Sequence, residues 1–308
     1  MKKIISNLNP FNNATDMPMV QYIIKKVLAF VLIYCVSALI GEGVVIGMLY
    51  GMGYDPLHGV MPEGLLAGLL PYYGMAIFIL VTFIYCILIE KRNPKSIGFT
   101  RKVPDYLLGT LIAVILLIII IGAGCAIGSI EYVGVNADAN IKNIILWALA
   151  FLIQGAMEEI MCRGFLLSSL QKKVNKPLAV VISSTAFVFP HLLTLIEASF
   201  PYPIIGIINL YLISFIFAEL VISRSNIWIA CGLHSVWNFV LYTIMGLTLS
   251  GSEGTLSNVI NFEVKKANVF NGGEYGIEAS VITTVVLGAF LLILLAKSKG
   301  RKIENGVQ

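Results

Sequence analysis

Charged residues are scarce in this chain. Only 12% of its 308 residues are Asp, Glu, Lys or Arg, whereas 58% are hydrophobic, and the mean hydropathy is +0.89. Soluble globular domains carry about a quarter charged residues. The deficit excludes an ordinary soluble domain and predicts an integral, multi-pass membrane protein. The net charge of +4 does not indicate a nucleic-acid partner, because the basic residues stand at the ends of apolar runs, where they set membrane orientation.

Histidine and paired cysteines are also scarce. The chain has three histidines and five cysteines, and no two cysteines form a C-x-x-C pair. All five cysteines lie within apolar segments, which favours small packing residues over disulfides or a metal cluster. No H-E-x-x-H sequence occurs, so the usual geometry of a zinc protease is not predicted.

Long hydrophobic runs, by contrast, are abundant. A helix needs about 20 apolar residues to cross the hydrocarbon of a bilayer. The sequence offers about eight such segments and therefore predicts an all-α fold, a polytopic membrane bundle of about eight transmembrane helices. The predicted spans are residues 27–50, 64–90, 107–128, 143–169, 177–197, 204–223, 227–249 and 279–296.

The basic residues predict how these spans are oriented. Cytoplasmic loops of membrane proteins carry an excess of Lys and Arg. With a cytoplasmic N-terminus, the segments 91–102, 172–176 and 297–302 also face the cytoplasm, and each of them is rich in basic residues. The sequence therefore predicts an integral cell-membrane protein with both termini cytoplasmic. This orientation requires an even number of spans.

Ionisable side chains inside the spans are the main functional signal. A charge at the bilayer centre costs about 2.5–3.5 kcal/mol on insertion scales, so such groups face a bundle interior and are usually paired. In the stretch QGAMEEIMCRGFLL, Glu159 and Arg163 are four residues apart, so they share a helix face and can pair. Such a pair accounts for Glu159 and Arg163 without any chemical role. Glu158 is rotated about 100° away and needs its own partner, or it serves as a general acid or base.

Two later spans contain histidines. His191 follows Pro190, which removes a backbone donor and predicts a kink that opens a pocket near the imidazole. His234 and Asn238 are four residues apart and point to one side of their helix. A histidine in an apolar helix is commonly a packing residue, and an asparagine there can simply bond to a neighbouring helix. As an alternative, their N–H groups are donors for a developing oxyanion.

These residues together resemble the type II CAAX prenyl endopeptidase family, which includes bacterial bacteriocin-processing and immunity membrane proteases (CPBP, Abi). The resemblance covers residues 143–245. The family motifs E-E-x-x-x-R, F-x-x-x-H and H-x-x-x-N stand here at Glu158-Glu159 to Arg163, Phe187 to His191, and His234 to Asn238.

The resemblance implies an intramembrane endopeptidase that hydrolyses a peptide bond in membrane-associated peptides or proteins, as in CAAX-box protein processing. It implies that Glu158 and His191 polarise the attacking water. It also implies that His234 and Asn238 stabilise the tetrahedral oxyanion. These assignments agree with the chemistry of the side chains, because a base must accept a proton and an oxyanion needs N–H donors.

The resemblance further implies a supporting role for Glu159 and Arg163, which hold the site together. A glutamate-dependent mechanism without metal is favoured, so no cofactor is expected. If the protein is instead a metalloprotease, the zinc ligands implied by the resemblance are Glu158, His191 and His234.

The resemblance also divides the chain into three regions. Residues 1–142 hold three spans, residues 143–249 form a protease-like catalytic core, and residues 250–308 form an extracytoplasmic loop and the last span. The expected partners are the lipid bilayer and a peptide or protein substrate, and no nucleic acid. Two other functions stay open: a non-enzymatic immunity or scaffold protein that binds a bacteriocin-like peptide or a signalling partner, and a transporter, which the lack of an inverted repeat disfavours.

Overall fold

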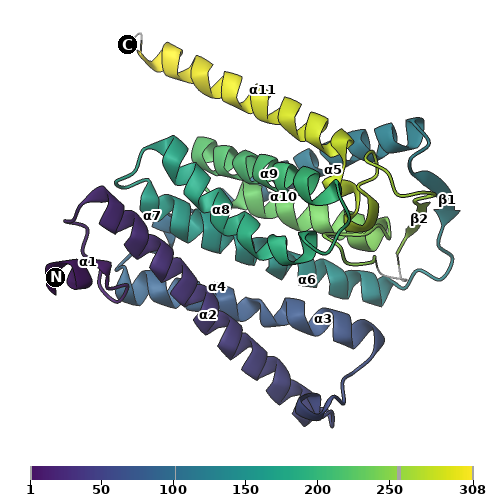
Figure 1. Ribbon diagram of the computed structural model, residues 1–308, viewed down its shortest axis with the longest axis horizontal. Helices are drawn as coiled ribbons and strands as arrows, with labels where there is room; N and C mark the ends of the chain where they lie inside the picture. Colours follow the sequence, from purple (N-terminus) through teal and green to yellow (C-terminus); the bar gives the residue numbers. More distant parts are fainter. Residues whose placement is uncertain (1, 101, 255–257, 307–308) are drawn as a thin grey trace. The chain divides into compact units, whose positions relative to one another are not determined.

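Helices dominate the computed structural model, which describes residues 2–100, 102–254 and 258–306 (Figure 1). Arg101 and the side chains of Arg301 and Lys302, which belong to the predicted cytoplasmic segments, lie outside the described residues. The helices are α1 (Lys2–Leu8), α2 (Met19–Gly51), α3 (Gly64–Gly74), α4 (Ala76–Ile84), α5 (Pro104–Ala126), α6 (Ile141–Glu159), α7 (Ser168–Leu170), α8 (Lys176–Leu195), α9 (Tyr202–Arg224), α10 (Trp228–Phe239) and α11 (Val281–Gly306), and the strands are β1 (Glu131–Val135) and β2 (Ile260–Glu263).

Within the described residues, seven helical segments are long and apolar enough to cross a membrane. They correspond to seven of the predicted spans and confirm the all-α, polytopic fold. The remaining predicted span, residues 227–249, contains a shorter apolar helix, Trp228–Ile244. At 1.5 Å per residue this helix extends about 25 Å, slightly less than the hydrocarbon thickness of about 30 Å.

The chain folds into two compact units. Unit 1 comprises Met1–Arg101 and Leu149–Ser183, and unit 2 comprises Lys102–Ala148 and Ser184–Gln308. Helices α6 and α8 each run from one unit into the other along the chain. The three regions expected from the sequence were defined by predicted spans and motifs, whereas the two units are defined by their internal contacts. The three regions therefore stay a prediction.

In unit 1, α2 packs along α3 and α4 (Figure 1). The fourth span does not end at its charged stretch. Helix α6 ends at Glu159, and the chain continues without interruption as a π-helix, Ile160–Leu167, before α7. This π-helix packs against α2 and α4. The wider turn of a π-helix is uncommon and often marks a functional site.

In unit 2, two glycines bring α5 and α10 into close contact. A Cβ atom on Gly109 would lie 2.0 Å from the carbonyl oxygen of Ile229, and one on Gly232 would lie 2.1 Å from that of Tyr106. Small residues allow this approach in membrane proteins, where helix association depends on close packing. The glycines therefore set the position of α10 against α5.

A polar corner fixes the start of α10. Arg224, the last residue of α9, pairs with Asp105 in the first turn of α5, with Nη2 2.5 Å from Oδ1. Asn226 donates to the same carboxylate, with Nδ2 2.5 Å from Oδ2, and its own Oδ1 accepts from the Trp228 amide at 3.1 Å. Because this amide belongs to the first residue of α10, the corner joins the ends of three helices.

A short antiparallel pair of strands joins two polar connections of unit 2. Strand β1 pairs with β2, and the rings of Tyr132 and Phe262 meet edge to face at 5.8 Å. The sequence predicted β2 only as part of a long polar loop and did not predict β1. Four or five residues between apolar spans give too weak a periodic pattern to be recognised as a strand.

Candidate active site

Glu158 lies near the end of α6 in unit 1 and is half-buried. The side-chain amide of Gln154, one turn earlier, donates to its carboxylate, with Nε2 2.5 Å from Oε1. Gln154 is a neutral partner, so this hydrogen bond orients the carboxylate without cancelling its charge. The sequence predicted that Glu158 needs a partner of its own, and Gln154 is one.

Glu159 forms a fully buried ion pair with Arg163. The Arg163 Nη1 atom lies 2.8 Å from Glu159 Oε1, and both side chains are 0% exposed. The predicted pairing is confirmed. A buried charge is tolerated when it is paired and hydrogen-bonded, and removing one partner costs about 3–5 kcal/mol. The pair therefore braces this part of the chain.

The π-helix that follows Glu159 changes the backbone next to these acids. In a π-helix the backbone bonds reach five residues along the chain instead of four. The hydroxyl of Ser183, near the end of the unit 1 part of α8, donates to the carbonyl of Cys162 at 2.8 Å. This hydrogen bond satisfies a buried carbonyl within the π-helix, as buried backbone groups require.

His191 lies on α8 in unit 2 and is half-buried. Its Nδ1 atom lies 3.0 Å from the carbonyl oxygen of Phe187, four residues earlier. A carbonyl only accepts hydrogen bonds, so in the neutral imidazole Nδ1 carries the proton and Nε2 keeps its lone pair. Helix α8 runs past Pro190 to Leu195, so the proline lies inside the helix and does not end it.

His234, on α10, is buried between aromatic rings of unit 2. The Phe217 ring stacks on the imidazole at 5.0 Å with an interplanar angle of 18°, and the Phe187 ring meets it edge to face at 5.8 Å. Phe187 also contacts the His191 ring at 5.1 Å. The aromatic side chain of the F-x-x-x-H motif thus lies against both histidines, so the structure brings His191 and His234 to one region of unit 2.

Asn238 lies one turn after His234 on α10, and both side chains are buried. Between them, Trp237 donates its indole N–H to Glu278, with Nε1 3.1 Å from Oε1. The other carboxylate oxygen of Glu278 accepts from the Ser250 amide at 2.9 Å and from its hydroxyl at 2.8 Å. Glu278 therefore fixes the rotation of α10 and with it the direction of His234 and Asn238.

The residues proposed as zinc ligands are divided between the units. Glu158 belongs to unit 1, whereas His191 and His234 belong to unit 2. In the described ranges, neither unit contains a group of three or more His, Cys, Asp or Glu side chains that could hold a metal ion. Zinc sites in proteins use three or four protein ligands. The side chains within either unit therefore do not fit a zinc ion, and no catalytic step is derived through a metal.

The comparison with known families bears on the same helices. The model of the family described as type II CAAX prenyl endopeptidase Rce1-like matches residues 140–240. The matched segment runs from α6 to the end of α10 and contains every candidate site residue. This segment is therefore similar to the Rce1-like family. The Rce1-like match and the apolar helices support an integral membrane protease of the CAAX type. No curated protein matches the chain.

Sequence reasoning missed three contacts of the candidate site. Gln154 lies four residues before Glu158, so the spacing rule that paired Glu159 with Arg163 also applied to it. Phe217 and Glu278 lie far along the chain from His234 and Trp237, and no local pattern indicates such contacts.

Proposed function

We propose that this chain is an intramembrane endopeptidase that hydrolyses a peptide bond in membrane-associated peptides or proteins. One observation supports the proposal most strongly: two adjacent glutamates have different surroundings. Glu159 forms a buried ion pair with Arg163. Glu158, in contrast, is half-buried, and the neutral side chain of Gln154 orients its carboxylate. A carboxylate that a neutral hydrogen-bond donor holds in one orientation is suited to general-base catalysis.

In the proposed reaction, Glu158 removes a proton from water while the water oxygen attacks the carbonyl carbon of the substrate. His191 assists through Nε2, whose lone pair accepts the second hydrogen of the same water. This role agrees with the hydrogen bond between Nδ1 and the Phe187 carbonyl, which keeps the proton on the other ring nitrogen. A carboxylate and an imidazole together orient the water and increase its nucleophilicity.

The negative charge then develops on the substrate oxygen, where N–H donors stabilise it. His234 and Asn238 are the proposed donors, and their shared face of α10 and their burial suit this role. Donors held rigidly in a dry site need no reorganisation when the charge appears. The tetrahedral intermediate collapses with cleavage of the C–N bond. Protonated Glu158 gives its proton to the leaving nitrogen and returns to a carboxylate.

The proposal uses no metal. Its support is the absence of an H-E-x-x-H sequence and the chemistry of Glu158, whose carboxylate can accept a proton without a metal. Purified protein treated with a strong chelator is expected to keep its activity. Loss of activity on chelation, with recovery when zinc is added back, would replace the glutamate mechanism with a metal-dependent one.

The direct experiment is cleavage of a library of membrane-associated peptides by the purified protein in lipid nanodiscs, with products identified by mass spectrometry. Glu158→Gln is expected to lower the rate about 10²–10⁴-fold, because general-base catalysis typically contributes that factor. Glu42→Gln is the matched control, since Glu42 is an exposed acid in α2. It should cleave at the rate of the unaltered protein.

The outcome also separates the enzyme from the non-enzymatic alternative. Equal cleavage by Glu158→Gln and the unaltered protein would contradict the proposed base. A Glu158→Gln variant that retains the full cellular effect of the protein would instead favour an immunity or scaffold protein that binds a bacteriocin-like peptide or a signalling partner.

A further inference from the structure

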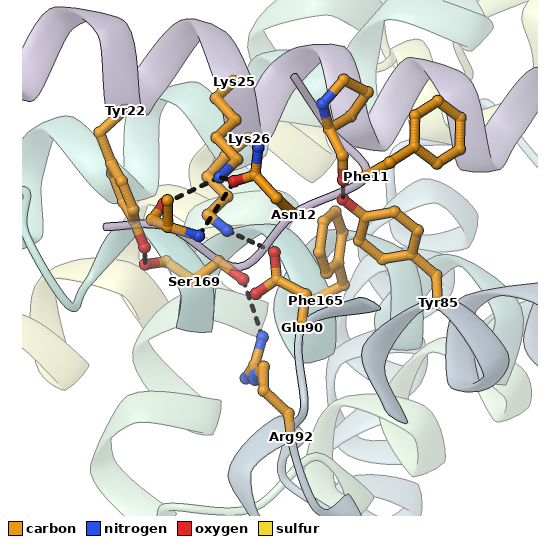
Figure 2. A network of polar contacts seen from close by, with 12 residues as sticks. Phe11, Asn12, Tyr22, Lys25, Lys26, Tyr85, Glu90, Arg92, Phe165 and Ser169 are labelled. Carbon is orange, nitrogen blue, oxygen red and sulfur yellow. Dashed lines mark hydrogen bonds and ion pairs between the residues drawn. The ribbon is translucent and has the colours of Figure 1, made fainter. Parts of the chain in front are cut away.

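The ends of three spans meet in a group of basic side chains in unit 1. The basic cluster comprises Lys25, Lys26, Arg92 and Lys172. Lys26, in the second turn of α2, pairs with Glu90, which directly follows the span Gly64–Ile89 (Figure 2). Arg92 binds Ser169 near the end of the span Ile141–Leu170. The cluster therefore lies where these spans leave the hydrocarbon.

Arg92 is a buried cation whose hydrogen-bond partners are neutral. Its guanidinium donates to the hydroxyls of Ser168 and Ser169, each at 2.7 Å, and to the Ser96 hydroxyl at 3.1 Å and the Ser96 carbonyl at 2.5 Å. The side chain is fixed in one orientation by these bonds. None of these oxygens carries a charge, so they orient the guanidinium without neutralising it.

Lys25 is in a similar position. It is 0% exposed, and its ammonium group donates to the side-chain oxygen of Asn12 at 2.7 Å and to the Ala14 carbonyl at 2.8 Å (Figure 2). The neighbouring Lys26 forms an ion pair with the carboxylate of Glu90. Buried charges are normally paired with opposite charge, because neutral partners recover only part of the desolvation cost.

Lys172 is the exposed member of the cluster. Partial burial of the side chain lowers the pKa of the Lys172 ammonium, and the positive charge of Arg92 lowers this pKa further. In the part of the chain that the structure describes, Glu90 is the one carboxylate whose charge acts on both Lys172 and Arg92. Four cations thus share a single acid, and this region of unit 1 has a surplus of positive charge.

We infer that the basic cluster binds the phosphate of an anionic phospholipid headgroup, with Lys172 as the exposed contact and Arg92 as the preoriented guanidinium behind it. Phosphate oxygens are the preferred acceptors of guanidinium and ammonium donors. The ends of transmembrane helices lie at the level of lipid headgroups, and basic side chains there attract anionic lipids. A bound phosphate supplies the counter-charge that the cluster's neutral partners do not.

Hydrogen bonds within unit 1 link Arg92 of the basic cluster to the π-helix. Ser168, which accepts from Arg92, donates its own hydroxyl to the carbonyl of Gly164. Gly164 directly follows Arg163 in the π-helix. A phosphate that stabilises Arg92 therefore also stabilises the backbone next to the Glu159–Arg163 pair. The inference does not depend on the proposed protease activity, because its readout is thermal stability.

The test uses the full chain in nanodiscs of phosphatidylcholine, with and without phosphatidylglycerol. The expected result is a rise in the midpoint of thermal unfolding of about 2–4 °C for the unaltered protein in the anionic discs, the size of shift that modest ligand stabilisation produces. Lys172→Gln is expected to lose this rise while keeping the midpoint in pure phosphatidylcholine, since Lys172 is exposed. Arg92→Gln should also lose the rise if it folds.

Lys297→Gln is the matched control, because Lys297 lies on α11 in unit 2, away from the cluster in the chain. It should keep the full rise. An equal loss for Lys297→Gln and Lys172→Gln would overturn the site in favour of general attraction to a charged surface. A full rise in Lys172→Gln would also overturn it. The same stabilisation by inorganic phosphate in pure phosphatidylcholine would overturn the assignment to a lipid headgroup.

Discussion

Glu158 and Glu159 are neighbours in the chain, yet their surroundings differ. Glu159 faces Arg163 across a fully buried contact of 2.8 Å, whereas Glu158 is half-buried beside a neutral amide. The spacing of Glu159 and Arg163 was sufficient to predict their pair, because residues four apart on a helix are neighbours. Burial of individual side chains depends on helices far away in the sequence, so the exposure of Glu158 was not predictable.

The first prediction contrasts the two acids. Glu159→Gln is expected to destabilise the protein by about 3–5 kcal/mol, because it removes the carboxylate charge from a buried guanidinium. Glu158→Gln is expected to lower the thermal midpoint much less, since Glu158 is half-buried and the glutamine amide can still bond to Gln154. Thermal unfolding of both variants in one lipid mixture measures this difference. Equal destabilisation would contradict the separate roles.

The second prediction concerns the two nitrogens of His191. The amide of His191→Asn reaches the position of Nδ1 and can still donate to the Phe187 carbonyl, but nothing replaces Nε2. This variant is therefore expected to fold normally and to lose about as much cleavage activity as His191→Ala. Activity and thermal midpoint are measured on the same preparations. Substantial activity in His191→Asn would show that Nε2 is not needed.

At the scale of elements, helix α10 is held in place by contacts with several parts of unit 2. Glycines bring it against α5, the Asn226 side chain fixes its first turn, and Glu278 holds Trp237. The sequence predicted α10 and the common face of His234 and Asn238, because both follow from helical periodicity. It did not predict what holds the helix, because those partners come from other elements.

The third prediction tests the contact between α5 and α10. Gly232→Ala is expected to destabilise the protein by about 1–3 kcal/mol, because its Cβ atom would lie 2.1 Å from the Tyr106 carbonyl oxygen and would force the helices apart. Gly122→Ala, on α5, is the control: nothing lies within 4 Å of its added Cβ atom. It should keep or slightly raise the thermal midpoint, as alanine favours helix. A harmless Gly232→Ala would contradict the packing.

The whole molecule is an integral membrane protein in which the candidate residues come from two units. Hydropathy predicted its spans well, because about 20 consecutive apolar residues are a strong signal. The same signal predicted a full span at residues 227–249, where the structure has the shorter apolar helix Trp228–Ile244. The π-helix and the strands were missed, since neither has a distinctive hydrophobic period over so few residues.

The fourth prediction is that both termini face the cytoplasm. The alternation of basic segments requires an even number of crossings. Seven long helices are found in the described ranges, so Trp228–Ile244 has to cross as well, despite a length of about 25 Å. Reporter fusions to each terminus measure this directly, with a basic segment such as 172–176 labelled as an internal check. Termini on opposite sides would mean that one of these segments does not cross.

The central claim is that Glu158 and His191 act on the same water. The measurement that tests it most directly is the cleavage rate of Glu158→Gln, His191→Asn and the double variant on one peptide under single-turnover conditions. Residues that act as a unit give losses that do not multiply. The double variant is therefore predicted to be about as slow as the slower single variant. A loss equal to the product of the two single losses would contradict the account.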